Sequence, residues 1–264
     1  MRKVSLFFLI LALVSAFSIK AQAADNRVVF LHHSTGGGVF WEGGVDQWIA
    51  DYNASHGTAI QVEEREYPSE PYAWENYPYD YWNLWINGAC DSSNPNIECM
   101  DSLASKYDVV IFKHCFPGAY VIPDFDYETP DVGSMERSMA NYKLQYQALR
   151  ELMDSYPDTV FIVWTLAPLH RMDTDAEAAA RAAEFVRWVK EDWLHEDGKA
   201  HPNIRIFDFW GLVAETSSNP SQGQANCLKY QFEQSHSDSD SHPNAEANRM
   251  VGPIFAQFIV DNLE

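Results

Sequence analysis

Basic residues are scarce in this sequence. Lysines and arginines number 18 against 38 aspartates and glutamates, so the formal net charge is −20 at pH 7. Nucleic acids and anionic membrane surfaces are held through positive patches, and a surface of this charge repels both. We therefore expect no nucleic-acid partner and no binding to anionic membranes. The acidic surface by itself indicates nothing about a reaction.

Long apolar runs are absent after the N-terminal segment. Arg2 and Lys3 precede an almost wholly apolar stretch over residues 4–19, and Ala21-Gln22-Ala23 has the small-x-small pattern of a cleavage site. This stretch is shorter than the ~20 apolar residues that a membrane anchor needs. We predict a signal peptide at residues 1–23, no membrane anchor, and a mature chain at 24–264 that is secreted or periplasmic.

Cysteine is also rare, with four residues in the whole chain. Export favours disulfides, and four cysteines allow three pairings. Cys90 and Cys99 flank a polar, proline-containing loop, so a local bridge between them is the simplest expectation. Cys115 and Cys227 either pair with each other or stay free. No feature of the sequence marks Cys115 as an activated nucleophile.

Internal repeats, linkers and abrupt changes of composition are missing, which predicts a single domain for residues 24–264. Apolar runs typical of strands occupy residues 28–31, 58–67, 108–113, 159–166 and 204–209. Helical spacing of apolar residues follows at 45–53 and 134–156, after a capping box at Thr174, and from Pro243 onward. This alternation predicts an α/β fold with a parallel sheet covered on both faces. The aromatic, proline-rich stretch from Tyr67 to Trp85 predicts no regular element.

Candidate chemistry begins where the first predicted strand ends. The run Val28–Leu31 is followed by His32-His33-Ser34 and then by three glycines at 36–38. In open α/β sheets, ligands bind outside the carboxyl ends of the strands, which is where Ser34 would lie. The glycines would let backbone N–H groups turn toward a bound group. A plain strand followed by a glycine turn would explain this stretch, taken alone, equally well.

A second candidate segment stands just before the last predicted helix. There Asp238, Asp240 and His242 precede Pro243 and Asn244. A serine hydrolase needs an imidazole that takes the hydroxyl proton and a carboxylate that orients that imidazole. The sequence has no Gly-x-Ser-x-Gly motif, so a standard α/β-hydrolase is not expected.

In this order of motifs, the chain resembles the SGNH/GDSL hydrolase superfamily over nearly the whole mature length. The resemblance rests on the strand-end Ser34, the alternating strands and helices, and Asp-Ser-His-Pro-Asn at 240–244. It implies a three-layer α/β/α, flavodoxin-like fold with a five-stranded parallel sheet. It also implies Ser34 as nucleophile, His242 as base, and an esterase, many of whose relatives deacetylate carbohydrates. No cofactor is expected.

Several positions depart from the family pattern. The Gly-Asp-Ser of the family is His32-His33-Ser34 here, and Lys113-His114-Cys115-Phe116 stands where the family has Gly-x-Asn-Asp. The family acid usually lies three places before the histidine, where this chain has Ser239. We assign the acid to Asp240, with Asp238 in reserve.

The remaining parts of the site are predicted from neighbouring segments. Donors to a developing oxyanion are expected from N–H groups of the Ser34 loop and from Lys113 or His114, because acyl transfer needs such donors. Of His32 and His33, which alternate faces of a strand, at most one is expected to face the site. Aromatic side chains stack on sugars, and the predicted contacts are Tyr72 and Trp74. The candidate loop donors are Gly36 and Gly37.

These residues predict a secreted or periplasmic serine esterase that removes an acyl group, expected to be acetyl, from a carbohydrate. Transfer of the acyl group to another sugar is a variant, and the oligomeric state is open. One alternative is a non-catalytic carbohydrate-binding protein on the same fold. Another is a metal-dependent deacetylase, since His236, Asp238, Asp240 and His242 alternate as ligands suited to zinc, with His32 or His33 as further ligands.

Overall fold

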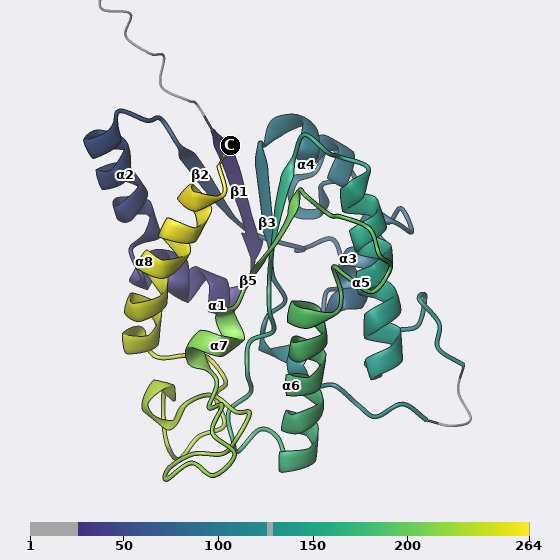
Figure 1. Ribbon diagram of the computed structural model, residues 1–264, viewed down its shortest axis with the longest axis vertical. Coiled ribbons are helices and arrows are strands. Elements are labelled where there is room, and N and C mark those ends of the chain that lie inside the picture. Colours follow the sequence, from purple (N-terminus) through teal and green to yellow (C-terminus); the bar gives the residue numbers. More distant parts are fainter. Residues whose placement is uncertain (1–25, 126–128, 264) are drawn as a thin grey trace, which may run out of the picture.

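A parallel sheet forms the centre of the molecule (Figure 1). The computed structural model describes residues 26–125 and 129–263, so the predicted signal peptide lies outside the described residues. In these residues the sheet has the strand order β2-β1-β3-β4-β5, which is the order of flavodoxin-like folds. This confirms the predicted α/β class. The strands are β1 (Arg27–His32), β2 (Gln61–Glu66), β3 (Val109–Phe112), β4 (Val160–Trp164) and β5 (Ile204–Phe207).

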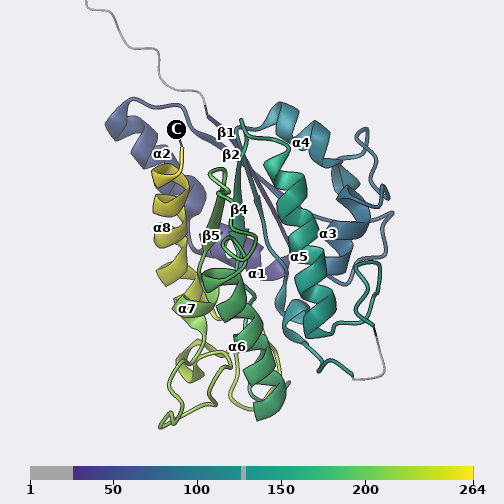
Figure 2. The same cartoon turned by 45° about the vertical axis from the view of Figure 1, so that its right-hand side comes forward.

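Helices cover both faces of the sheet (Figures 1 and 2). One layer consists of α2 (Val45–His56), α7 (Phe209–Val213) and α8 (Ala245–Asp261). The other consists of α3 (Pro78–Trp85), α4 (Met100–Lys106), α5 (Met139–Asp154) and α6 (Ala176–Glu191). Short helical turns complete the described chain: α1 (Ser34–Gly37), η1 (Gly38–Glu42), η2 (Pro95–Ile97), η3 (Phe116–Ala119) and η4 (Tyr230–Phe232). None of these helices combines the length and hydropathy needed to cross a membrane.

The strand β1 is buried on both faces, which explains its continuous apolar run. Val28 and Phe30 face the core under α2 and α8, whereas Val29 and Leu31 face the core under α3 to α6. On one side β1 pairs with β2, and on the other it pairs with β3 through Leu31 and Phe112. The carboxyl ends of β1 and β3 therefore lie side by side, where the order of strands reverses and where ligands bind in such folds.

The predicted irregularity of the aromatic stretch is wrong in its second half, where α3 begins at Pro78. Proline suits the first position of a helix because its missing N–H would have no partner there. The carboxylate of Asp80 accepts the N–H of Glu75 at 3.0 Å and of Asn76 at 2.6 Å. These bonds join the preceding loop to the first turn of α3.

Three helices begin later than predicted. In each, a side chain further along the sequence than the predicted start caps the helix. The Asp175 carboxylate accepts the Ala178 N–H at 2.8 Å, so the N-cap of α6 is Asp175 and not Thr174. Asn244 caps α8 one residue after Pro243, and the helix continues through Pro253. Ser138 caps α5. Each cap satisfies a backbone N–H that has no partner within its helix.

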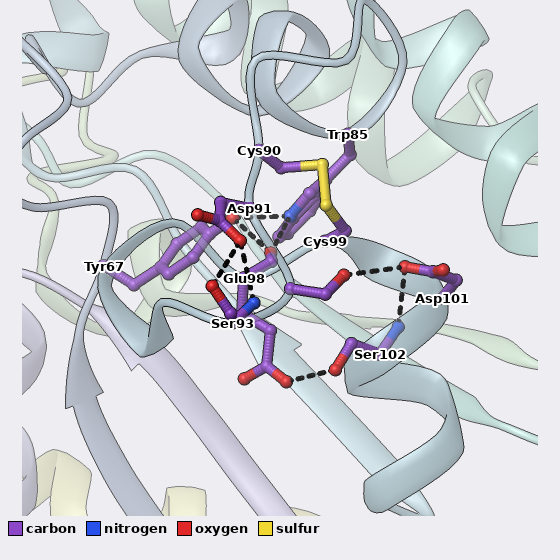
Figure 3. The surroundings of a disulfide bond; sticks show 10 residues. Tyr67, Trp85, Cys90, Asp91, Ser93, Glu98, Cys99, Asp101 and Ser102 are labelled. Atoms are coloured by element: carbon purple, nitrogen blue, oxygen red, sulfur yellow. Dashed lines mark hydrogen bonds between the residues drawn. A yellow bond between two sulfur atoms is a disulfide. The ribbon is translucent and has the colours of Figure 1, made fainter.

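The predicted disulfide between Cys90 and Cys99 is confirmed (Figure 3). It closes the loop between α3 and α4. Beside it, the Trp85 indole donates to the Tyr67 hydroxyl at 2.6 Å, and that hydroxyl donates to the Glu98 carbonyl at 2.9 Å. The other two cysteines, at positions 115 and 227, are buried and free.

Candidate active site

Ser34 is the first residue of α1 and follows β1 after one extended residue, His33. The predicted open glycine loop is instead a helical turn that continues into the π-helical η1. The N–H groups of Gly36 and Gly37 donate to the His33 carbonyl at 2.7 and 3.4 Å, so they do not turn toward a bound group as predicted. Gly36 is required by packing, because an added Cβ would lie 2.5 Å from the Cβ of His32.

The imidazole of His242 lies between Ser34 and Asp240. Its Nε2 is 2.7 Å from the Ser34 Oγ, although the two residues are 208 positions apart, and its Nδ1 is 2.6 Å from the Asp240 Oδ1. Burial raises the pKa of Asp240, but hydrogen bonds from the His242 backbone and ring outweigh it and hold the pKa below its ordinary value. The reserve acid, Asp238, accepts the N–H of the next residue, Ser239, at 2.7 Å.

The loop that carries His242 is fixed on both sides. Before it, the Ser241 hydroxyl accepts the His170 N–H at 2.8 Å and donates to the Asp173 carboxylate at 3.0 Å. After it, the Asn244 side chain accepts two N–H groups of the first turn of α8, both at 3.1 Å. Hydrogen bonds of Ser241 and Asn244 thus anchor the chain on either side of His242.

The segment after β3 contacts both Ser34 and His242. The Phe116 ring meets the His242 ring edge-on, with centroids 4.9 Å apart at 83°. The Cys115 Sγ lies 3.3 Å from the Ser34 Oγ. No local sequence pattern marks Cys115 as a site residue. The adjacency of β1 and β3 in this strand order is the signal that would have indicated it.

The two predicted donors next in sequence to Cys115 are fully buried. The ring of His114 lies in the core among the rings of Tyr81 and Tyr146, with centroids 5.0 and 5.6 Å away. Burial lowers the pKa of His114 to about 3. Burial also lowers the pKa of Lys113. Within the described part of the chain, neither the Lys113 Nζ nor the His114 ring nitrogens have a hydrogen-bond partner.

Asn76 is a candidate that the sequence did not distinguish from its neighbours. It is fully buried, and its φ of 60° lies in the left-handed region, which asparagine tolerates. Its Oδ1 accepts the N–H of Cys115, the residue whose sulfur contacts the Ser34 Oγ. Its Nδ2 has no partner among the described residues. A buried donor left unpaired costs about 1–3 kcal/mol, which makes this nitrogen a candidate ligand contact.

Of the two predicted aromatic contacts, only Trp74 presents a large surface. It is 40% exposed and stacks on the ring of His33, with centroids 3.7 Å apart. Burial lowers the pKa of His33 to about 4, so the ring is neutral at pH 7 and its Nε2–H donates to the Pro68 carbonyl at 2.6 Å. Tyr72 packs against the core instead, and its hydroxyl accepts from Asn83 at 2.9 Å.

A cavity of about 190 Å³ opens beside Ser34. One wall is formed by η1 and α8, which approach so closely that a Cβ on Gly252 would lie 2.2 Å from the Gly43 carbonyl oxygen. The remaining lining is mostly polar. The cavity is bounded by Ser34, Thr35, Gly38, Glu42, Gln234, His242, Pro243 and Asn248.

Two of the histidines predicted as metal ligands, His236 and His32, contact carboxylates outside the predicted ligand set. The Nδ1 of His236 lies 2.8 Å from the Glu233 carboxylate, and the Nε2 of His32 lies 2.6 Å from the Glu64 carboxylate. Across residues 26–125 and 129–263, no three His, Cys, Asp or Glu side chains gather as a metal ion would require.

Comparisons with known proteins add little to this geometry. No protein-family model and no curated protein matches the chain. One similar solved structure is described as a gut microbial diltiazem-metabolizing enzyme, with 13% sequence identity and a TM-score of 0.45. The match covers 92% of this chain and 48% of that one, so the chain spans about half the length of that structure.

Proposed function

We propose that this protein is a serine ester hydrolase, a divergent enzyme of SGNH/GDSL type with Ser34, His242 and Asp240 as its catalytic triad. One observation carries the proposal. The His242 ring has its Nε2 2.7 Å from the Ser34 Oγ and its Nδ1 2.6 Å from the Asp240 carboxylate. This arrangement of hydroxyl, imidazole and carboxylate supports a triad, because triads occur with their members in different orders along the chain.

In the proposed reaction, the Ser34 Oγ attacks the carbonyl carbon of an ester while its proton passes to the His242 Nε2. Asp240 accepts the Nδ1–H, keeps the imidazole in the required tautomer and stabilises the imidazolium. His242 then gives the proton to the departing alcohol as the ester C–O bond breaks, leaving the acyl group on Ser34. A water molecule activated by His242 releases the acid and restores the hydroxyl.

We assign the oxyanion contacts to the Ser34 N–H and the Asn76 Nδ2. Ser34 is the first residue of α1, and N–H groups at that position have no acceptor within the helix. The Asn76 amide is anchored by the Cys115 N–H and has its donor unused in the described structure. These two groups replace Gly36 and Gly37, whose N–H groups are already bonded to the His33 carbonyl.

The substrate is proposed to be an acetylated carbohydrate outside the cytoplasm. The cavity of about 190 Å³ at Ser34 is smaller than the ~300 Å³ at the lower end of drug-sized sites, which favours a short acyl group. Trp74, exposed and stacked beside the site, offers a flat apolar face to a sugar ring. The N-terminal segment and the Cys90–Cys99 disulfide support export.

Labelling with a fluorophosphonate probe, followed by mapping of the modified residue, tests this proposal. We expect the label on Ser34, turnover of an aryl acetate, and release of free acetate from an acetylated oligosaccharide. Ser34→Ala and His242→Ala should remove nearly all turnover while circular dichroism stays unchanged. Turnover that is lost on chelation and restored by added metal would overturn the serine mechanism. Oligosaccharide binding without turnover, unaffected by Ser34→Ala, would indicate a binding protein instead.

A further inference from the structure

Cys115 is a buried free thiol that the reaction proposed above does not use. It follows β3, whereas Ser34 follows the neighbouring β1, and the sheet places the two side by side. The sulfur lies 3.3 Å from the Ser34 Oγ and 3.0 Å from the Thr35 Oγ1. The Thr35 backbone N–H also donates to this sulfur. The residue is 3% exposed, so water does not compete for these bonds.

A second buried group, Lys113, interacts electrostatically with the same thiol. Lys113 is fully buried, and its Nζ has no hydrogen-bond partner within residues 26–125 and 129–263. Burial raises the pKa of Cys115, but the charge of Lys113 and the contacts with Ser34 and Thr35 outweigh it, so the pKa falls below its ordinary value. The lowered pKa makes the sulfur a better hydrogen-bond acceptor than an ordinary thiol, which accepts only weakly.

We propose that Cys115 is a positioning residue, whose sulfur accepts hydrogen bonds from Thr35 and holds the first turn of α1 so that the Ser34 hydroxyl faces His242. The proposal rests on the proposed function, since it requires Ser34 to be the nucleophile. A serine side chain has three staggered positions about χ1. Contacts with Nε2 of His242 on one side and the sulfur on the other select one of them, without Cys115 forming or breaking any bond.

The experiment compares Cys115→Ala and Cys115→Ser with Cys227→Ala, the same change at the other buried free cysteine. Each variant is assayed for kcat and KM on an aryl acetate and for the rate at which a fluorophosphonate labels Ser34. We expect Cys115→Ala to lower kcat and the labelling rate by up to about 10²-fold, the effect of misplacing a reacting group, with little change in KM. Cys115→Ser restores an acceptor and should recover much of the loss. Cys227→Ala should match the wild type.

Wild-type kcat and labelling in Cys115→Ala would overturn the proposal, and so would a label found on Cys115 itself in the wild type. If Cys115→Ala does not fold, Thr35→Val removes one donor to the sulfur at similar volume and should also lower kcat, with unchanged kcat counting against the proposal. Failure of the proposed function is distinguishable, because the wild type would then show neither ester turnover nor a label on Ser34.

Discussion

Asp240 holds His242 at two points. One carboxylate oxygen, Oδ1, accepts both the backbone N–H of His242 at 3.0 Å and the ring Nδ1–H at 2.6 Å. The backbone bond fixes the carboxylate relative to the loop, and the ring bond fixes the imidazole relative to the carboxylate. The other ring nitrogen, Nε2, is then available to the Ser34 hydroxyl. A spacing of two residues thus places the Asp240 carboxylate on the His242 ring.

Replacement of this acid should be severe. Asp240→Asn keeps the size of the side chain but offers Nδ1–H an uncharged group, so the imidazolium formed in the reaction loses its stabilisation. We expect kcat on an aryl acetate to fall by about 10³–10⁴-fold, as for the corresponding change in serine proteases. Asp238→Asn is the matched control, because the Asp238 carboxylate accepts the neighbouring Ser239 N–H and not the His242 ring. A larger loss in Asp238→Asn would show that the acid is misassigned.

Asn76→Ala should reduce kcat far more than it changes KM. The Nδ2 is assigned to the oxyanion, which carries charge in the transition state and little in the bound ester, and losing one such donor typically costs about 10²–10³-fold. The exposed Asn87→Ala serves as the control for steady-state kinetics. Thermal unfolding should accompany the assay, since Asn76 also accepts the Cys115 N–H. A variant that folds normally and retains full kcat would contradict this role.

Trp74→Ala should weaken the binding of an oligosaccharide. The indole is 40% exposed on top of His33, one residue before Ser34, so its removal takes away a stacking surface worth about 1 kcal/mol or more. We expect KM for an acetylated oligosaccharide to rise several-fold, measured as initial rates of acetate release. Trp41, 58% exposed, provides the comparison. Greater sensitivity to Trp41→Ala would place the sugar on η1 and not on the loop after β2.

The fold should lose stability as the pH falls below about 6.5 because two buried histidines are neutral in it. Burial lowers the pKa of His33 to about 4 and of His114 to about 3. Their ordinary value is near 6.5. Between these values the unfolded chain binds more protons than the folded one, so each histidine lowers the free energy of unfolding by up to about 1.4 kcal/mol per pH unit as the pH falls.

Urea unfolding of His114→Phe between pH 7 and pH 4 tests this pH dependence. The variant should lose less stability over that range than the wild type, whatever its stability at pH 7, because one proton-binding site of the unfolded chain is gone. Phe112→Leu, a neighbouring buried change without a titratable group, should retain the wild-type slope. Equal slopes in all three proteins would show that His114 does not contribute.

Local patterns in the sequence were sufficient for much of the fold and for part of the site. The strands β1 and β3 are buried on both faces, and such strands are continuous apolar runs that any reader of the sequence finds. The Cys90–Cys99 pairing follows from a short polar loop. Ser34 and His242 were singled out because each stands beside a recognisable element end, the first after a strand and the second before a helix.

The first residues of the helices and the structure of the aromatic stretch are harder to predict from the sequence. Asp175 and Thr174 are both good capping residues, and the structure has Asp175 at the N-cap of α6. Proline residues, which suggested an irregular segment from Tyr67 to Trp85, instead allow α3 to begin at Pro78. Here tertiary packing of Tyr81, Leu84 and Trp85 in the core outweighs the local signal.

The surroundings of Ser34 depend on the order of the strands in the sheet. Cys115 reaches Ser34 across 81 positions of sequence because β3 pairs with β1, and Asn76 reaches Cys115 from the loop after β2. Periodicity, caps and turn residues act over a few residues and specify which elements form. Contacts between the ends of different strands depend on the order of strands in the whole sheet. No local pattern at Cys115 or Asn76 therefore predicts their contacts around Ser34.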